Sequence, residues 1–379
     1  MSTVAARIFA ELRGDRVIWA ILVLLAIFSI LAVYSSTGTL AYREHGGNTE
    51  GFLIKHGIIM MGGLVLAYIT HLIPHDKFRK WASALLGIAA PLLIYTLAFG
   101  TDINNAKRWI QLPMVGITIQ TSAFAKVALI VFVAAAISGK QDYIKDFKSA
   151  FLPIIVPILI ICGLIAPADL SSALLLFLTC LLMMFVGRVA LKYIGVLLFW
   201  GVIVFAVLIL LGKQFPDIVR SGTWQNRMEE FMTQEDGGYQ VQQAKIAIAN
   251  GGIVGLGPGN SRQRNYLPSP YSDFIYAIIC EEYGLIGGMS IIFLYLLLFF
   301  RITRLMTKSD KTFGAMVAMG LGISLIIQAF TNIAVSIHLV PVTGVTLPMV
   351  SMGGTSLLFT AFAFGIILSV SKHVEANAE

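Results

Sequence analysis

The stretch 251–284, GGIVGLGPGNSRQRNYLPSPYSDFIYAIICEEYG, joins a polar loop to an apolar helix. Asp273 lies at the junction, and Glu281 and Glu282 follow within the apolar run. An ionisable side chain inside a membrane helix is costly without a partner and indicates a functional role by default. Asp273 equally suits the N-terminal cap of a helix, a position at which Asp is preferred. The two roles are compatible.

Composition places the chain in a membrane. Hydrophobic residues make up 57% of the sequence and charged residues only 12%, whereas about a quarter of residues are charged in an ordinary globular domain. The mean hydropathy is +0.83. The formal charge of +7 is scattered over short loops and forms no basic stripe, so we expect no nucleic-acid partner. The three cysteines, Cys162, Cys180 and Cys280, fall in apolar segments and are expected to be packing residues without a disulfide.

Apolar segments long enough to span a bilayer, which takes about 20 residues, recur along the chain. We expect an all-α, polytopic integral membrane protein of about ten helices in a single domain, 1–379, with one long extracytoplasmic loop at about 213–272. No small-residue cleavage site follows the first apolar run, so it stays as the first span. The predicted spans are 17–35, 52–73, 81–99, 121–138, 150–166, 171–186, 193–211, 274–300, 313–337 and 355–371.

The distribution of Lys and Arg predicts the orientation, because short loops rich in these residues stay on the cytoplasmic side. The opposite short loops hold only Arg43, Lys107 and Arg108. Both termini are therefore predicted to be cytoplasmic and the active site extracytoplasmic. The residues counted on the cytoplasmic side are Arg7, Arg13, Arg16, Lys77, Arg79, Lys80, Lys140, Lys145, Lys148, Arg188, Lys192, Arg301, Arg304, Lys308, Lys311 and Lys372.

Several polar side chains belong to the outer half of the predicted bundle. Lys126 lies about 8 Å below the start of the fourth span, deep enough to seek an anion or water, with snorkelling as the alternative. Helical periodicity puts Glu281 on the stripe of Asp273 and turns Glu282 away. Since Asp273 and Glu281 are about 12 Å apart along such a helix, they have different tasks. We expect Glu281 to pair with Lys126, which leaves Asp273 for chemistry.

The helix N-termini suggest the kind of ligand. Every even-numbered span starts on the outer side, where its positive dipole end favours a phosphate or diphosphate group. A lipid diphosphate suits this arrangement. The run GGIVGLGPG has the look of a dinucleotide-binding loop, but no strand precedes it, so a nucleotide site is rejected.

These residues resemble the SEDS family (shape, elongation, division and sporulation), the FtsW and RodA type of peptidoglycan glycosyltransferases, over essentially the full chain. The SMGGT version of one motif and the opening GDRVIWA favour the division type over the elongation type. The segments that carry the resemblance are Arg108-Trp109 with Gln120, Ser122 and Lys126; Asp169-Leu170; Arg227 and GYQVQQA; Gly251, Gly252, Gly255, Gly257 and Gly259; LPSPYSDFIYAIICEEYGLIG; and NIAVSIHLVPVTGVTLPMVSMGGTSLL.

The resemblance implies polymerisation of lipid II at the outer face of the cytoplasmic (inner) membrane, with Asp273 as general base. We expect no cofactor and assign no metal ligands, while dependence on a divalent cation stays open. Its implied partners are lipid II, a class B penicillin-binding protein transpeptidase and other divisome proteins. Glu281, Glu282 and Asp169 take supporting roles. The implied substrate-binding residues are Arg108, Lys126, Gln120, Ser122, Arg227, Arg262, Asn332, Ser351, Gly353 and Gly354.

Two departures from the family pattern matter. Thr121 and Ala123 replace the usual proline and glutamate ahead of Lys126, so the lysine needs a partner from another helix, either Glu281 or Asp169. Asp169 lies in an altered version of the family motif, so the family role is assigned to it less firmly. Two other functions stay open: a lipid II flippase, which needs a polar route across both leaflets, and a non-catalytic divisome scaffold, which needs none of these charged residues.

Overall fold

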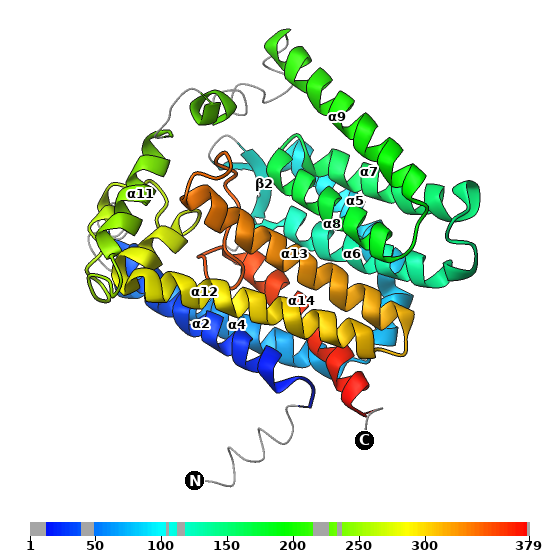
Figure 1. Ribbon diagram of the computed structural model, residues 1–379, viewed down its shortest axis with the longest axis horizontal. Helices are drawn as coiled ribbons and strands as arrows, with labels where there is room; N and C mark the ends of the chain where they lie inside the picture. The colour runs from blue at the N-terminus through cyan, green and yellow to red at the C-terminus, as the bar shows by residue number, and fades with distance from the viewer. Residues whose placement is uncertain are drawn as a thin grey trace.

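The protein is a bundle of long apolar helices, shown by a computed structural model in Figure 1. The structure describes residues 13–38, 49–103, 106–111, 118–214, 227–232 and 237–376. The helices are α2 (Arg16–Ser36), α4 (Thr49–Leu72), α5 (His75–Phe99), α6 (Thr121–Gly139), α7 (Leu152–Ile165), α8 (Leu170–Val186), α9 (Leu191–Gln214), α11 (Tyr239–Gly251), α12 (Ile275–Lys308), α13 (Thr312–Ser336) and α14 (Thr355–Ala376).

Eight helices within the described ranges are long and apolar enough to cross a membrane. They match eight of the predicted spans, and the shorter apolar helices α8 and α9 occupy the other two positions. The all-α, multi-pass class is thereby confirmed, while the exact number of ten spans stays a prediction. The predicted loop at 213–272 also stays a prediction, because residues 215–226 and 233–236 lie outside the described residues.

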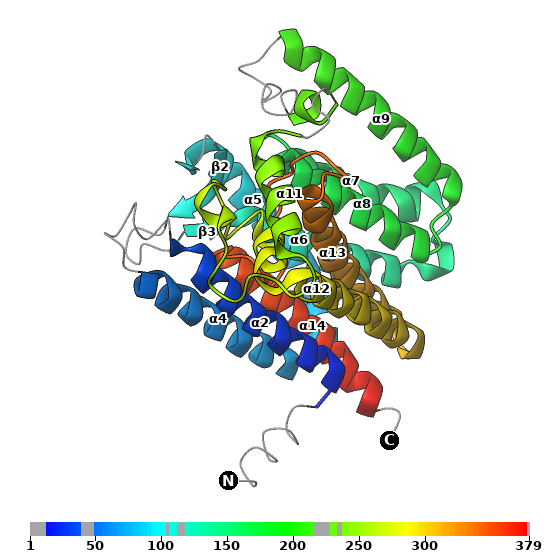
Figure 2. The same cartoon turned by 60° about the vertical axis from the view of Figure 1, so that its left-hand side comes forward.

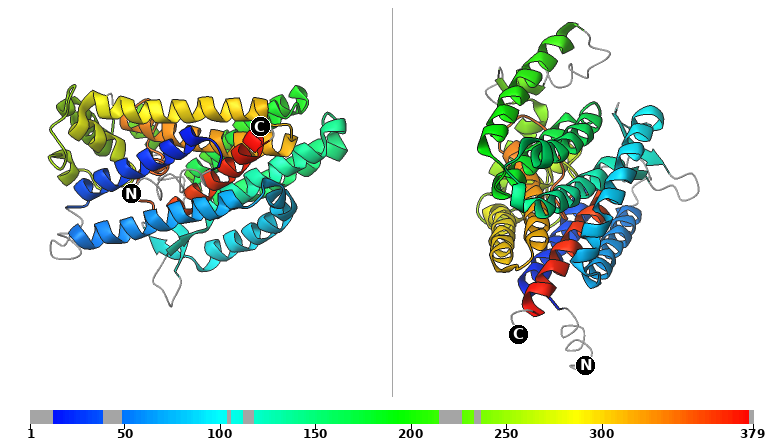
Figure 3. Two further views of the ribbon diagram at one scale, coloured as in Figure 1. Left: turned by 90° about the horizontal axis from the view of Figure 1, so that it is seen from below. Right: turned by 90° about the vertical axis from the view of Figure 1, so that its right-hand side faces the viewer.

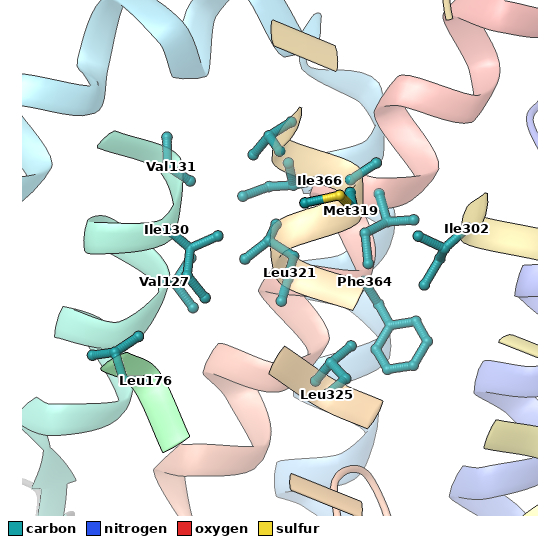
Figure 4. Close-up of a cluster of buried hydrophobic side chains, with 14 of the residues drawn as sticks. Val127, Ile130, Val131, Leu176, Ile302, Met319, Leu321, Leu325, Phe364 and Ile366 are labelled. Carbon is teal, nitrogen blue, oxygen red and sulfur yellow. The ribbon is translucent and has the colours of Figure 1, made fainter. Parts of the chain in front are cut away.

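The core lies where α6, α12, α13 and α14 meet. Figure 4 shows Ile130 of α6, Leu321 of α13 and Phe364 of α14 pointing toward one another, and each is at most 1% exposed. Helices α2 and α4 pack beside α14 on one side, and α9 lies at the opposite edge of the bundle next to α8 (Figures 2 and 3). Outward-facing side chains are largely apolar, as a lipid environment requires.

Contacts between distant parts of the chain close one end of the bundle. Asp15, the cap of α2, accepts a hydrogen bond from Arg301 Nε at 2.7 Å and donates its own N–H to Ser371 Oγ at 3.0 Å. Lys311 Nζ and Asp76 Oδ2 are 2.6 Å apart. Those of the basic residues counted above that the structure describes lie at this end, at the start of α2, at the end of α14 and around the connections α4–α5, α6–α7, α8–α9 and α12–α13.

A three-stranded antiparallel sheet stands at the other end, where the sequence analysis expected only a loop. It comprises β1 (Thr101–Ile103), β2 (Ala106–Gln111) and β3 (Thr118–Gln120) in the order β1-β2-β3. Its register pairs Trp109 with Gln120. Thr355 Oγ1 accepts a bond from Gln120 N at 3.1 Å and donates to Thr118 O at 2.9 Å, so the sheet is fixed to the start of α14.

Helix α12 is broken at Gly284, whose φ and ψ are 65° and −163°. In an unbroken α-helix the N–H groups of residues 285 and 286 would bond to the carbonyls of 281 and 282. Residues 252–257 supply the missing partners: two of their carbonyls accept from the N–H groups of 285 and 286, and two of their N–H groups donate to the carbonyls of 281 and 282. An added Cβ at Gly255 would lie 2.1 Å from Glu282 O, and at Gly284 2.3 Å from Ile253 O, so this close approach requires glycine. The four substituting bonds are Leu285 N to Gly252 O (2.9 Å), Ile286 N to Ile253 O (3.3 Å), Leu256 N to Glu281 O (2.9 Å) and Gly257 N to Glu282 O (2.9 Å).

Candidate functional site

A cavity of about 830 Å³ opens at the sheet end of the bundle. Its walls come from α4, β2, β3, α6, α8, α13, α14 and the loops before α12 and α14. The polar and charged side chains that line it are Lys55, His56, Arg108, Trp109, Thr118, Gln120, Lys126, Asp169, Ser172, Arg227, Ser269, Tyr271, Ser272, Asp273, Ser324, Gln328, Thr343, Thr346, Thr355, Ser356 and Thr360.

Helix N-termini converge on this cavity, as the alternation of spans predicts. Gln120, Asp169 and Gly354 immediately precede α6, α8 and α14, and all three line the cavity. Asp273 precedes Phe274, the N-cap of α12. The positive ends of four helix dipoles therefore border one space, which suits an anionic ligand.

The backbone around Asp273 is held by the last turns of α13 and by the segment that connects α13 and α14. The carbonyls of Tyr271, Ser272 and Asp273 each accept one hydrogen bond from these parts of the chain. The donors are Met352 N (2.9 Å), Ser351 Oγ (2.7 Å) and Asn332 Nδ2 (2.8 Å), respectively. Asn332 and Ser351 are buried behind the cavity wall and do not line it. They hold the backbone beside Asp273, and the role in substrate binding that the sequence analysis gave them stays a prediction.

The carboxylate of Asp273 keeps most of its hydrogen-bonding capacity for the cavity. Ser272 Oγ, 3.0 Å from Oδ1, is its hydrogen-bond partner within the described chain. Burial raises the pKa of the Asp273 carboxyl above its ordinary value. The Ser272 hydrogen bond and the charges of Arg227 and Arg108 lower that pKa and only partly offset the effect of burial.

Lys126 and Arg108 meet at Asp169. Lys126 Nζ donates to Ser172 Oγ at 3.2 Å, and Ser172 Oγ donates in turn to Asp169 Oδ2 at 2.8 Å. Arg108 Nη1 lies 3.2 Å from the same Asp169 oxygen, and its Nε donates to Ala168 O at 2.7 Å. Asp169 also caps α8 through Ser172 N. This acid, the weaker of the two partners considered for Lys126, joins both cations in one network.

The expected pair of Lys126 and Glu281 is wrong. Glu281 accepts hydrogen bonds from the hydroxyl of Ser261 and from the N–H groups of Arg262 (3.1 Å) and Gln263 (3.2 Å). It is 0% exposed and does not line the cavity. The error arose because the helix begins at Ile275, so Asp273 does not lie on its periodic stripe.

Glu282 contacts the same loop as Glu281, the one that contains Ser261. It accepts hydrogen bonds from the hydroxyl of Ser35 and from Ser261 N at 3.4 Å. Arg264 Nη1 donates to the carbonyls of Ser35 (3.0 Å) and Gly259 (2.9 Å) beside it. Both glutamates therefore hold the loop in front of α12.

The remaining predicted residues divide between the cavity and its surroundings. Arg227 lines the cavity and donates to Val342 O at 3.1 Å, while Gly353 and Gly354 border it at the start of α14. Ser122 is buried behind Arg108, and its hydroxyl has no hydrogen-bond partner among the described residues. Arg262 is exposed and lies outside the lining. The side chain of Lys107 is outside the described residues.

Sequence reasoning missed Lys55 and His56 on α4. Both line the cavity, and His56 Nε2 lies 2.8 Å from Ser29 Oγ. Their signal was available, because a lysine and a histidine inside the apolar run 52–73 are ionisable groups within a membrane span. Within the described ranges no group of three or more His, Cys, Asp or Glu side chains could hold a metal ion.

Comparisons with known proteins agree with this architecture. Residues 15–376 match the "Cell cycle protein" family model of FtsW, RodA and SpoVE. The "Probable peptidoglycan glycosyltransferase FtsW" of Trichlorobacter lovleyi is 35% identical over 94% of this chain and 93% of its own length. The stage V sporulation protein E of Bacillus subtilis is 32% identical over 95% of this chain and 97% of its own.

Solved structures share the fold. The crystal structure of the rod shape determining protein RodA of Thermus thermophilus superposes with a TM-score of 0.66 at 21% identity, covering 94% of this chain and 96% of that one. A chain from a structure described as "Structural coordination of polymerization and crosslinking by a peptidoglycan synthase complex" superposes with a TM-score of 0.72 at 23% identity, covering 95% and 98%.

Proposed function

Because this chain belongs to the FtsW, RodA and SpoVE family, we propose that it is a peptidoglycan glycosyltransferase that polymerises lipid II during cell division. The observation that carries the proposal is the shared cavity of Asp273, Arg108 and Lys126, which helix N-termini border. An acid, two cations and several dipole ends facing one space match a reaction that removes a proton and releases a diphosphate.

Asp273 acts as the general base. It accepts the proton of the acceptor GlcNAc 4-hydroxyl while that oxygen attacks the anomeric carbon of the donor MurNAc. The new glycosidic bond forms as the bond from the anomeric carbon to the diphosphate breaks, with inversion, and undecaprenyl diphosphate leaves. A pKa raised by burial suits this role, since a base works best when its pKa approaches the working pH. A positioned base contributes about 10² to 10⁴-fold.

Arg108 and Lys126 stabilise the departing diphosphate. Asp169 holds both cations at one wall of the cavity through its contact with Arg108 and through Ser172. Arg is suited to bidentate phosphate contacts and Lys acts as a point charge. The first turns of α6, α8 and α14 add the positive ends of their dipoles next to the same groups.

The proposal places the chain in the cytoplasmic membrane with the cavity on the outer side, and both termini in the cytoplasm. Support comes from the basic residues at the end of the bundle opposite the cavity. We further propose a class B penicillin-binding protein transpeptidase as partner, within the divisome. One structural relative comes from a complex described as coordinating polymerization and crosslinking.

A lipid II flippase is the competing function, and the depth of the cavity argues against it. The deepest α6 residue in its lining is Ile130, about half-way along a helix that ends at Gly139. Among the described residues, the polar lining extends from the outer end to Ser324, midway along α13, whereas transport needs a polar route through both leaflets. The cavity thus supports polymerisation on one side.

The test uses the purified full chain with its transpeptidase partner in liposomes that contain lipid II. Asp273→Asn is expected to form no glycan polymer, while Asp142→Asn, which changes an exposed acid, is expected to polymerise at the wild-type rate. A flipping assay is run on the same vesicles. Polymer from Asp273→Asn at the wild-type rate refutes the base assignment, and flipping without polymer refutes the enzyme.

A further inference from the structure

A short apolar segment projects from the bundle in front of the break in α12. We call residues 252–257 the apolar tip. Ile253, Val254 and Leu256 are 69%, 75% and 37% exposed. The sequence from Ile246 to Ser261 contains no charged residue. Exposed apolar side chains that cluster in this way mark a binding surface more often than a water-facing loop.

The backbone of the apolar tip is bonded within the protein on both sides of its outermost residues. Most of its N–H and C=O groups are bonded, four of them to the groups freed by the break at Gly284. Asn260 adds bonds from its N–H to Gly257 O (3.2 Å) and from Nδ2 to Leu256 O (3.1 Å). Lipid tolerates irregular backbone only where its polar groups find protein partners. The N–H groups of Ile253 and Val254 and the carbonyls of Val254 and Gly255 have no hydrogen bond among the described residues, so this backbone stays at the level of the lipid headgroups and only the side chains enter the acyl layer.

The break lies near the outer boundary of the membrane. The apolar part of α12 after the break, from Leu285 to Phe300, is about 24 Å long at 1.5 Å per residue, so it accounts for most of a hydrocarbon core of about 30 Å and puts the break within about one helical turn of the outer boundary. This part alone shows a lipid-facing stripe: Leu285, Ile286, Met289 and Phe293 are 52–61% exposed. Residues 275–282, in contrast, are all buried within the protein.

We propose that the apolar tip is a membrane anchor that inserts Ile253 and Val254 among the acyl chains of outer-leaflet lipids. Its carbonyls bond to the N–H groups of Leu285 and Ile286, so its exposed side chains adjoin the start of the lipid-facing stripe of α12. The anchor ties α11 and the loop held by Glu281 to the bilayer surface. If the proposed function holds, it also fixes the height of Asp273 above the membrane.

The test is spin labelling of the purified full chain in lipid nanodiscs. Val254→Cys reports the apolar tip, Met289→Cys a lipid-facing position on α12, and Arg262→Cys an exposed position on the following loop. The three native cysteines are buried and free, so the label goes to the introduced thiol. Nitroxide accessibility to oxygen, which partitions into lipid, is compared with accessibility to a water-soluble nickel chelate. Ile253→Cys serves as a second reporter should Val254→Cys fold poorly.

The label at 254 is expected to favour oxygen over the nickel chelate as the label at 289 does, and the label at 262 to show the reverse. Nickel accessibility at 254 equal to that at 262 overturns the anchor. So does loss of both accessibilities at 254 when the transpeptidase is bound, because a protein then covers the segment. The measurement needs no substrate, so it stands or falls independently of lipid II polymerisation.

Discussion

Asp273 and Glu281 lie in the same short stretch, yet the protein surrounds them in opposite ways. Glu281 accepts hydrogen bonds from a hydroxyl and from successive backbone N–H groups, and is sealed from solvent. Asp273 is bonded to Ser272 and faces a cavity. A buried carboxylate whose hydrogen bonds are complete holds structure, and one with free acceptor capacity beside a cavity is available to a ligand. The local hydrogen-bond inventory, more than the position in an apolar run, separates the two roles.

The largest expected difference between the two acids is in turnover. Asp273→Asn is expected to lower lipid II polymerisation by at least about 100-fold, the size of a general-base contribution. Glu281→Gln keeps the shape of the side chain and is expected to retain most of the activity of each folded molecule. Both rates come from the same liposome assay, normalised to folded protein. Equal losses would show that Asp273 has no special role in the chemistry.

The cation network gives the next largest effect. Lys126→Met is expected to lower polymerisation by about tenfold or more, since a charge that stabilises the leaving group is lost. A double-mutant cycle with Asp169→Asn should show a coupling of about 0.5–3 kcal/mol, as is usual for members of one network. The cycle with Glu281→Gln should show additive effects. Coupling of Lys126 to Glu281 would contradict the geometry described above.

For stability the expected order is the reverse: replacing Glu281 should destabilise the fold more than replacing Asp273. Glu281→Ala leaves buried N–H groups of the loop 261–263 without an acceptor, a loss of about 1–3 kcal/mol. Asp273→Ala removes a carboxylate that burial disfavours, and is expected to leave the thermal unfolding temperature unchanged or slightly raised. Thermal unfolding in detergent, with Asp142→Ala as the exposed-acid control, measures both. A destabilised Asp273→Ala would mean that the cavity acid also holds the fold.

The smallest effect is in the pH dependence. Because burial raises the pKa of Asp273, the ionised base is lost as pH falls through a value above the ordinary Asp range, and polymerisation falls with it. Arg227 opposes this rise, so Arg227→Gln should move the acidic limb to higher pH. Profiles of kcat/KM against pH for the two proteins measure the displacement. A limb that moves to lower pH would contradict the electrostatic role of Arg227.

Much of the fold follows from the sequence because lipid imposes a simple rule of length and polarity. Runs of about 20 apolar residues were sufficient to place the helices, even where Pro91 and Pro157 lie inside them. The sheet from Thr101 to Gln120 was missed because its strands are short and depend on contacts with the start of α14. The break at Gly284 was missed because residues distant in the sequence satisfy it.

Three residues of the site were predicted from different signals. Lys126 is an ionisable residue inside a predicted span, Asp273 lies where a polar loop meets an apolar run, and Arg108 follows from the resemblance; the structure brings all three to one cavity. The pairing of charges was not predictable. A helical wheel that includes Asp273 assumes a helix two residues longer than the real one, and this small error moved Glu281 to the wrong side. Lys55 and His56 were overlooked because the motifs drew attention to later spans.

The break in α12 also constrains the order of assembly. Residues 252–257 are synthesised before the groups at 281–286 that they bond, and the separation along the chain is short, so the two partners meet early. In the orientation proposed above, the loop that carries residues 252–257 must cross the membrane before this pairing forms. Translocation of that loop is then a prerequisite for completing the eighth predicted span during biogenesis.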